Sequence, residues 1–248
     1  ISKLQNNEMI GESPRKFDSP IVIIDPIDRN RNLGAAISIQ NVTNFILIAR
    51  NFLKKSSISY FKEKSKNKIP VELAKNTLVV SFKYKKRSDD IIYGQIKRAA
   101  SSLESQMNKE GFNVLRSDAV AYDETNASLL FLLESLSVSK NEIRTGPDVF
   151  SADFSTKFIH TNSKKSKLMW TDKEGKLQSL QTRRYENAKS YLNDLIKNHI
   201  GDSGIPKGLR PDFKTGFKIK SGKDKQSTSV KKSISKLITT DETAFSTN

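Results

Sequence analysis

The chain has 248 residues, 35% of them apolar, and its 43 lysines and arginines against 27 aspartates and glutamates give a formal net charge of +16. This apolar fraction still allows a core, and the positive excess is larger than solubility requires, so we expect a polyanionic partner: RNA, DNA or an anionic membrane. The lack of cysteine excludes a disulfide, a zinc knuckle and a thiol nucleophile, and two isolated histidines exclude a histidine-rich metal site.

No apolar run approaches the roughly 20 residues that cross a bilayer, and the first residues lack the basic-then-apolar order of a signal peptide. We therefore expect a soluble, cytoplasmic protein with no membrane partner. The chain begins with isoleucine rather than methionine, which indicates that the natural N-terminus lies elsewhere.

Residues 21–38, IVIIDPIDRNRNLGAAIS, join a short apolar run to a loop rich in charge. Asp25 and Asp28 are three residues apart, so a magnesium pair is one interpretation. The stronger one is a turn at Pro26, in which both acids accept hydrogen bonds from backbone amides or hold the arginines in place. Arg31 then offers a planar fork of donors to a phosphate or a base edge, although a purely structural ion pair is an equally good reading.

The next segments alternate helix and strand. Residues 39–55 have helical apolar spacing with one face to bury, and residues 56–70 are polar and lysine-rich, which predicts a linker or mobile loop. Residues 76–84 alternate as a half-buried strand, and Ser88 precedes a helix that Gly111 ends. Residues 112–122 and 127–136 predict a pair of strands.

The second half predicts a short strand over 141–150 with a Gly-Pro turn, a hairpin over 166–182 and a helix over 183–200. Residues 201–248 are rich in glycine and lysine with little apolar periodicity, which predicts a basic, loosely packed tail. The fold class is therefore α+β, with a helical segment, a mostly antiparallel sheet with packed helices, and the basic tail.

No familiar enzyme motif is intact. The sequence has no GxGxxG, GKS, GKT, GxSxG or Asp-x-Asp, and Asp172-Lys173-Glu174 falls in the predicted hairpin turn, where solvated acids are common. Aromatic residues lie within basic stretches at 59–62, 82–86 and 183–185, where they suit stacking beside phosphates. Because the positive charge is spread along the chain, a duplex fits it better than a short single strand.

Several stretches together resemble one family, the archaeal-type (class I) CCA-adding tRNA nucleotidyltransferases. DPIDRNRNLGAAIS (25–38) is similar to the family's DPVDPxRNVAAALS, with Arg29 at the usual proline and Leu33-Gly34 in place of Val-Ala. The resemblance covers most of residues 20–200 and continues through NFILIARNFL (44–53), DDIIYGQIKRAASSL (89–103), EGFNVLRSD (110–118), EIRTGPDVF (142–150) and RRYENAKSYL (183–192).

The resemblance implies the neck, body and tail of such an enzyme without its catalytic head, since no Gly-Ser dipeptide occurs and only some twenty residues precede the motif. It implies that residues 1–66 end the neck, 67–200 form an RNA-binding body and 201–248 form the tail. Magnesium would be held by the missing head, so this chain would have no catalytic or metal-binding residue and would be inactive alone. The substrates would be ATP, CTP and the acceptor-stem side of tRNA, and a homodimer is left open.

The resemblance also implies roles for single residues. Arg31 would meet the incoming nucleotide or the tRNA end, with Asp25 and Asn32 shaping its loop. We expect tRNA contacts from the basic residues Arg29, Lys97, Arg98, Arg144, Arg183, Arg184, Lys207 and Arg210. The alternatives are a non-catalytic module that binds structured RNA, and another template-independent nucleotidyltransferase such as a poly(A) polymerase.

Overall fold

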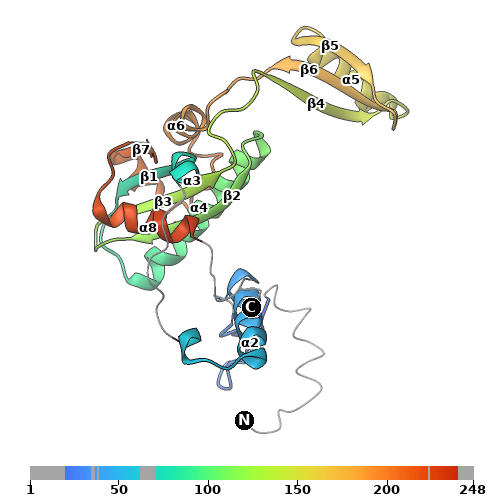
Figure 1. Cartoon of the computed structure of the whole chain (residues 1–248). Helices are drawn as coiled ribbons and strands as arrows, with labels where there is room; N and C mark the ends of the chain where they lie inside the picture. Colours follow the sequence, from blue (N-terminus) through green and yellow to red (C-terminus); the bar gives the residue numbers. More distant parts are fainter. Residues whose placement is uncertain (1–19, 35–36, 38, 62–70, 223, 240–248) are drawn as a thin grey trace. The chain divides into compact units, whose positions relative to one another are not determined.

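A computed structural model of the chain describes residues 20–34, 37, 39–61, 71–222 and 224–239 (Figure 1). Two units divide the chain: the described residues up to Phe61 fall in the first, and those from Val71 onward fall in the second. Each unit is described by itself. None of the helices in the described segments combines the length and the apolar character needed to cross a membrane.

The first unit contains the loop of residues 20–34, helix α2 (Ile39–Lys54) and the 3-10 helix η1 (Ile58–Phe61). The predicted helix over 39–55 is confirmed, but the expectation of a buried face is wrong. Phe45 and Leu53 are 72% and 81% exposed, because no other long helix or sheet covers α2 within the described part of this unit. Within the range of the expected linker, residues 58–61 form η1, whose Phe61 ring packs edge-on against Phe52, and residues 62–70 lie outside the described residues.

The second unit is built on an antiparallel sheet with the strand order β2-β3-β1-β7. Its strands are β1 (Thr77–Lys83), β2 (Val114–Ala121), β3 (Asn126–Leu133) and β7 (Phe217–Ser221). The predicted strand over 76–84 and the predicted strand pair are confirmed. Val80 lies opposite Leu129 on one side and Ile219 on the other, so β1 is central and β7 is an edge strand.

One face of this sheet is covered by α4 (Asp89–Lys109) and α6 (Ala188–Asn198), with the short α7 (Arg210–Thr215) beside β1. The prediction for α4 is confirmed, and Gly111 takes the left-handed φ of 91° that ends the helix. Ser88 stands at the N-cap position, but its hydroxyl accepts no capping hydrogen bond. The buried positions of α4 are the six expected from periodicity: Ile92, Ile96, Ala99, Ala100, Leu103 and Met107.

The other face is covered by α8 (Thr228–Ile238), with α3 (Val71–Lys75) packed against that helix (Figure 1). Val79 and Leu130 of the sheet pack with Val230 and Ile234 of α8. The expectation of a loosely packed tail is therefore wrong for the described residues 201–222 and 224–239. For the same reason β1 is buried on both faces rather than half-buried, since Val79 is as inaccessible as Leu78 and Val80.

A second antiparallel sheet has the order β4-β6-β5 and is formed by β4 (Asn141–Asp148), β5 (Ser166–Thr171) and β6 (Lys176–Thr182). The predicted hairpin is confirmed. Gly146-Pro147 lies at a register shift within the β4–β6 pairing rather than in a turn. Helix α5 (Ala152–Asn162), for which no element was predicted, contacts β4.

The helix predicted over 183–200 begins later than expected. Residues 183–187 return from the second sheet to the first, and α6 starts only after Asn187. The Asn187 side chain accepts hydrogen bonds from the amides of Lys189 and Ser190 at 2.9 Å and 3.4 Å, so a strong N-cap fixes the start.

Candidate nucleic-acid interface

The loop of residues 20–34 is closed by its own hydrogen bonds. The Asp25 amide donates to the Arg31 carbonyl at 3.0 Å, and the Leu33 amide donates to the Ile23 carbonyl at 2.8 Å. Asn32 Oδ1 accepts from the amides of Ile23 and Gly34 at 2.9 Å and 2.8 Å. The Asn32 side chain therefore links the backbone of Ile23 to that of Gly34, and the residues between them form a compact loop.

The acids of this loop support turns, as in the stronger of the two sequence interpretations. Asp25 Oδ1 accepts the Ile27 amide at 2.9 Å, and Asp28 Oδ1 accepts the Asn30 amide at 2.9 Å. The second carboxylate oxygen of Asp25 lies 3.9 Å from Nη1 of Arg31. Among the described residues no group of three His, Cys, Asp or Glu side chains is placed to hold a metal ion. The donor set here is that of a capped turn rather than a magnesium site.

Arg31 is one of two exposed arginines in this loop. Its side chain is 70% exposed, whereas that of Asp25 is 14% exposed, so the carboxylate anchors one edge of a guanidinium that otherwise faces solvent. Such a fork can bind a phosphate or a base edge through two parallel hydrogen bonds. Arg29 is exposed in the same loop and makes no hydrogen bond or ion pair with the residues that the structure describes.

In the second unit, three of the predicted contacts are exposed cations without a partner among the described residues: Lys97 and Arg98 of α4, and Lys207. The segment that carries Lys207 runs along α4. Gln106 Nε2 donates to the Asp202 carbonyl at 3.0 Å, near one end of this segment, and Arg87 bridges Gln95 and the Gly208 carbonyl near the other. The exposed face of α4 and this segment thus form one continuous part of the surface.

Arg144 and Arg184 are more than half exposed but are already paired. Nε of Arg144 donates to Glu142 at 2.7 Å. Nη2 of Arg184 lies 3.6 Å from the carboxylate of Asp194, and its guanidinium carbon lies 5.0 Å from the centre of the Tyr185 ring. Both guanidinium groups keep free edges for an anion.

Arg183 and Arg210, which were also expected to contact tRNA, make hydrogen bonds within the fold. The Arg183 side chain is only 13% exposed, pairs with Glu142 at 3.3 Å, and donates to the carbonyls of Ser139 and Glu110. Arg210 donates to the carbonyls of Ile205 and Gly201 at 2.9 Å and 3.2 Å. Because Arg183 is nearly covered and Arg210 uses Nε and Nη2 within the chain, both are weaker candidates for an exposed phosphate contact than the cations without partners.

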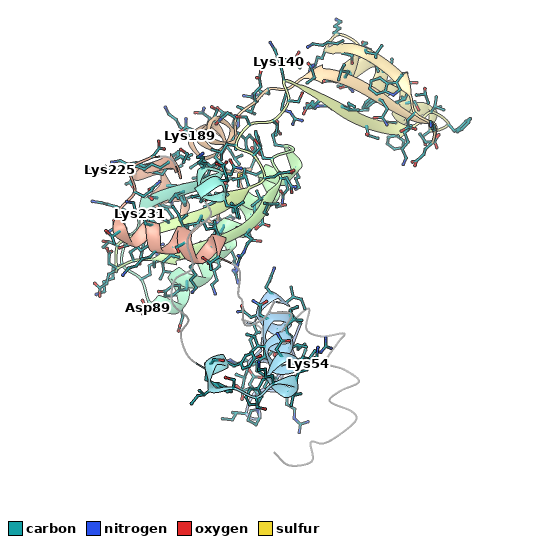
Figure 2. The ribbon with its side chains drawn as sticks, viewed as in Figure 1. Lys54, Asp89, Lys140, Lys189, Lys225 and Lys231 are labelled. Atoms are coloured by element: carbon teal, nitrogen blue, oxygen red, sulfur yellow. The ribbon has the colours of Figure 1, made fainter. Side chains whose placement is uncertain are left out.

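Within residues 214–236 the predicted basic tail carries exposed lysines in β7 and on both sides of it, none of which was among the single residues expected to contact tRNA. Residues 214–236 contain a single acid, Asp224. Lys225 and Lys231 project from this part of the ribbon (Figure 2). Lys218 and Lys220 stand at alternate positions of an edge strand, a spacing that could have revealed them. Among the described residues of 214–236, the exposed lysines are Lys214, Lys218, Lys220, Lys225, Lys231, Lys232 and Lys236.

Two acids of the second unit, Asp194 of α6 and Asp224 after β7, are held as carboxylates by hydrogen bonds. Tyr185 and Asn198 donate to Asp194 and lower its pKa, and the Ser221 amide does the same to Asp224. Burial raises the pKa of Tyr191 to about 12, so this tyrosine stays neutral. Asp194 and Asp224 are therefore charged and Tyr191 is neutral around neutral pH.

The fold and these surfaces define an α+β protein with exposed cations suited to a polyanion. Two family models match it in order along the chain: tRNA nucleotidyltransferase, second domain, at residues 1–62, and CCA-adding enzyme, C-terminal domain, at residues 74–222. The second match covers more than half of the chain. The chain therefore belongs to the CCA-adding enzyme family, and the resemblance read from the sequence is confirmed.

Named relatives agree with these matches. A CCA-adding enzyme of Pyrobaculum neutrophilum is 35% identical over 139 residues, which are 56% of this chain and 32% of that protein. A CCA-adding enzyme of Pyrobaculum islandicum is 29% identical over 77% of this chain and 44% of that protein. One from Saccharolobus shibatae is 31% identical over 71% of this chain and 41% of that protein. The chain thus spans less than half the length of these relatives.

Proposed function

We propose that this chain is the tRNA-binding C-terminal half of an enzyme that adds CMP and AMP, from CTP and ATP, to the 3′ end of tRNA. The observation that carries the proposal is the pair of family matches, which follow one another along the chain. The relatives named above bear the same activity in their names. The proposal includes a cytoplasmic location and allows a homodimer.

In this proposal Arg31 contacts the incoming nucleotide or the tRNA end. Its exposed guanidinium is anchored by Asp25, and Asn32 fixes the loop that carries both. Preorganisation of this kind lowers the entropy lost when an anion binds. Arg29, on the same loop, adds a second positive charge for the same ligand.

The second unit would hold the acceptor-stem side of tRNA. Lys97, Arg98 and Lys207 supply exposed cations without partners among the described residues, and Arg144 and Arg184 keep free edges. Contacts of this type bind the phosphate backbone without reading sequence, which suits a protein that must accept every tRNA. We do not include Arg183 and Arg210, because their donors are used within the fold.

Magnesium, which the family implies, does not fit the described residues. Asp25 and Asp28 already accept backbone amides, and no group of three candidate ligands occurs in the described segments. We therefore assign the ion to the part of the relatives that this chain does not span.

Filter binding and nucleotide incorporation test the proposal. We expect the chain to retain tRNA at physiological ionic strength in preference to an unstructured oligonucleotide, and to incorporate no labelled ATP or CTP alone. Equal retention of both nucleic acids would refute the preference for tRNA. Robust incorporation by the chain alone would refute the proposal that this half binds tRNA and lacks the catalytic residues. Addition of adenylates only by the complete enzyme would favour a poly(A) polymerase.

Within a complete enzyme that carries this chain, Arg31→Ala should impair nucleotide addition more than tRNA binding. The loss of one bidentate contact is worth about 1–3 kcal/mol. Lys97→Gln is the matched control, because it should weaken tRNA binding and its salt dependence while leaving the chemistry of bound tRNA unchanged. Equal losses of addition and binding in Arg31→Ala would contradict the assignment.

A further inference from the structure

The sheet β2-β3-β1-β7 borders a pocket to which the proposed function assigns no role. The pocket has a volume of about 610 Å³ and lies between the ends of β1, β3 and β7 and the first turn of α8. A space of this size falls in the range of small-molecule sites, about 300–1,000 Å³. Every residue that lines it belongs to the described part of the chain.

The strand register places polar groups together on the floor of this pocket. Ser81 of β1 lies opposite Ser128 of β3 and Lys218 of β7, so their side chains share one face of the sheet. The two serine hydroxyl oxygens are 2.8 Å apart and hydrogen-bond to each other. Lys83 and Asn126 form the next pair on the same face. The floor thus offers hydroxyl, amide and ammonium groups within one patch.

The charge of the pocket favours an anionic group. Lys83 and Lys218 are exposed and make no hydrogen bond or ion pair with the described residues. The first turn of α8 closes one side, with its positive helix end and the exposed hydroxyl of Ser229. One acid, Asp123, also lines the pocket, but its carboxylate already accepts hydrogen bonds from Thr125 and Asn126.

The rest of the lining is suited to a flat ring. Val230 contributes apolar surface, and Tyr122, which packs with the same cluster on the α8 face of the sheet, contributes an aromatic side chain. The Tyr122 hydroxyl is covered and has no hydrogen-bond partner. A covered hydroxyl without a partner is costly, and a polar ring edge that enters the pocket could give it one after a small side-chain shift.

We propose that this pocket binds one unpaired nucleotide unit, with the base against Tyr122 and Val230 and the phosphate between Lys83 and Lys218. The unit comes either from the RNA that the chain holds, which rests on the function proposed above, or from a free nucleoside monophosphate. Both sources present the same chemistry, so the pocket can be tested with mononucleotides before RNA is used.

The natural lack of cysteine makes a direct test possible. Ser229→Cys places one thiol on the pocket lining, and Thr228→Cys places one on the adjacent exposed position outside it. The rate of maleimide alkylation of each variant is measured with AMP, CMP, ribose 5-phosphate or inorganic phosphate. At a ligand concentration ten times the dissociation constant, AMP or CMP should slow alkylation of the Ser229→Cys variant about tenfold by mass action and leave that of the Thr228→Cys variant unchanged.

A second pair of variants tests the lysines. Lys83→Gln with Lys218→Gln should raise the half-protecting concentration of AMP about tenfold or more, because two charge-assisted contacts are lost. Lys214→Gln with Lys232→Gln removes the same charge from exposed positions outside the lining and should change it little. Three results overturn the proposal: no protection by any nucleoside monophosphate, equal protection by inorganic phosphate, or equal protection of the Thr228→Cys thiol.

Transfer RNA distinguishes the two sources. If bound tRNA protects the thiol of the Ser229→Cys variant more than that of the Thr228→Cys variant, the RNA is the donor of the nucleotide. In another outcome, monophosphates protect the thiol in the pocket, while tRNA is retained on a filter but does not protect it. This outcome would identify a free nucleotide as the ligand of the pocket. Failure to retain tRNA refutes the proposed function, while the monophosphate experiment still decides the pocket.

Discussion

The sheet of β2, β3, β1 and β7 is packed by apolar side chains, whereas the sheet of β4, β6 and β5 is packed by polar ones that hydrogen-bond to each other. In the first sheet Leu78, Leu129 and Phe131 are fully buried. In residues 141–182, Leu177 is the only buried apolar side chain, beside Gln178, Ser179 and Gln181. Gln181 Nε2 donates to Asn162 at 2.7 Å and to Ser179 at 2.8 Å.

This contrast shows two ways of fixing an antiparallel sheet. Burial of apolar side chains stabilises a fold in proportion to the buried area and tolerates small shifts of the side chains. A buried polar network is stabilising only when every donor and acceptor has its partner. The first sheet, which helices cover on both faces, should set the global stability of the second unit. The second sheet should be the less stable of the two, and its loss should depend on single hydrogen bonds.

Truncation in the first sheet should have the largest effect. Phe131→Ala should lower the free energy of unfolding by about 3–5 kcal/mol, because it leaves a cavity between β3 and the helices that cover it. Urea unfolding followed by circular dichroism measures the change. Leu115→Ala, at a side chain that is 50% exposed, should cost less than about 0.5 kcal/mol. A similar loss in the two variants would show that this core does not dominate.

Removal of one partner of a buried ion pair should have the second largest effect on the free energy of unfolding. Asp212 is 3% exposed, pairs with Arg87 at 2.5 Å and accepts the Lys85 amide at 3.2 Å. Asp212→Ala should cost about 3 kcal/mol, because it leaves the mostly buried Arg87 without its partner. The control is Glu124→Ala, which breaks an exposed pair with Lys86 and should cost at most about 1 kcal/mol in the same unfolding experiment.

A smaller and local effect should follow in the second sheet. Gln181→Ala leaves Asn162 and Ser179 each without one partner and should cost about 1–3 kcal/mol. Hydrogen exchange should show lost protection in β4, β5 and β6 and unchanged protection in β1 and β3. Thr182→Ala, an exposed neighbour on the same strand, should change neither. An equal loss in both sheets would mean that they unfold together.

Lowering the pH should destabilise the second sheet before the first, and this should be the smallest of the effects. The amide of Lys176 and the side chain of Gln178 donate to Asp172 and lower its pKa, so its stabilising contribution is present above about pH 4 and is lost as the pH falls through the lower folded-state value. The emission of Trp170, the only tryptophan, should report loosening of this sheet before the first sheet unfolds. Asp172→Asn should flatten this dependence, and Asp153→Asn should not.

The sequence indicated the elements whose pattern is local. The six buried positions of α4 follow from helical period, the Lys173–Gly175 turn follows from turn chemistry, and the capping roles of Asp25 and Asp28 follow from their positions on either side of the turn at Pro26. The resemblance carried by residues 25–38 and five later stretches was enough to identify the family, which the family matches confirm.

By itself, then, the sequence determined the α+β class, the family and the loop that carries Arg31. Only the tertiary structure showed that residues 201–239 supply an edge strand and a covering helix, that Arg183 and Arg210 are used within the fold, and that Ser81, Ser128 and Lys218 meet in one pocket. The physical reason is that local periodicity and turn chemistry act over a few residues. Strand pairing, burial of a second sheet face and the choice of a partner for each cation depend on segments far apart in the chain.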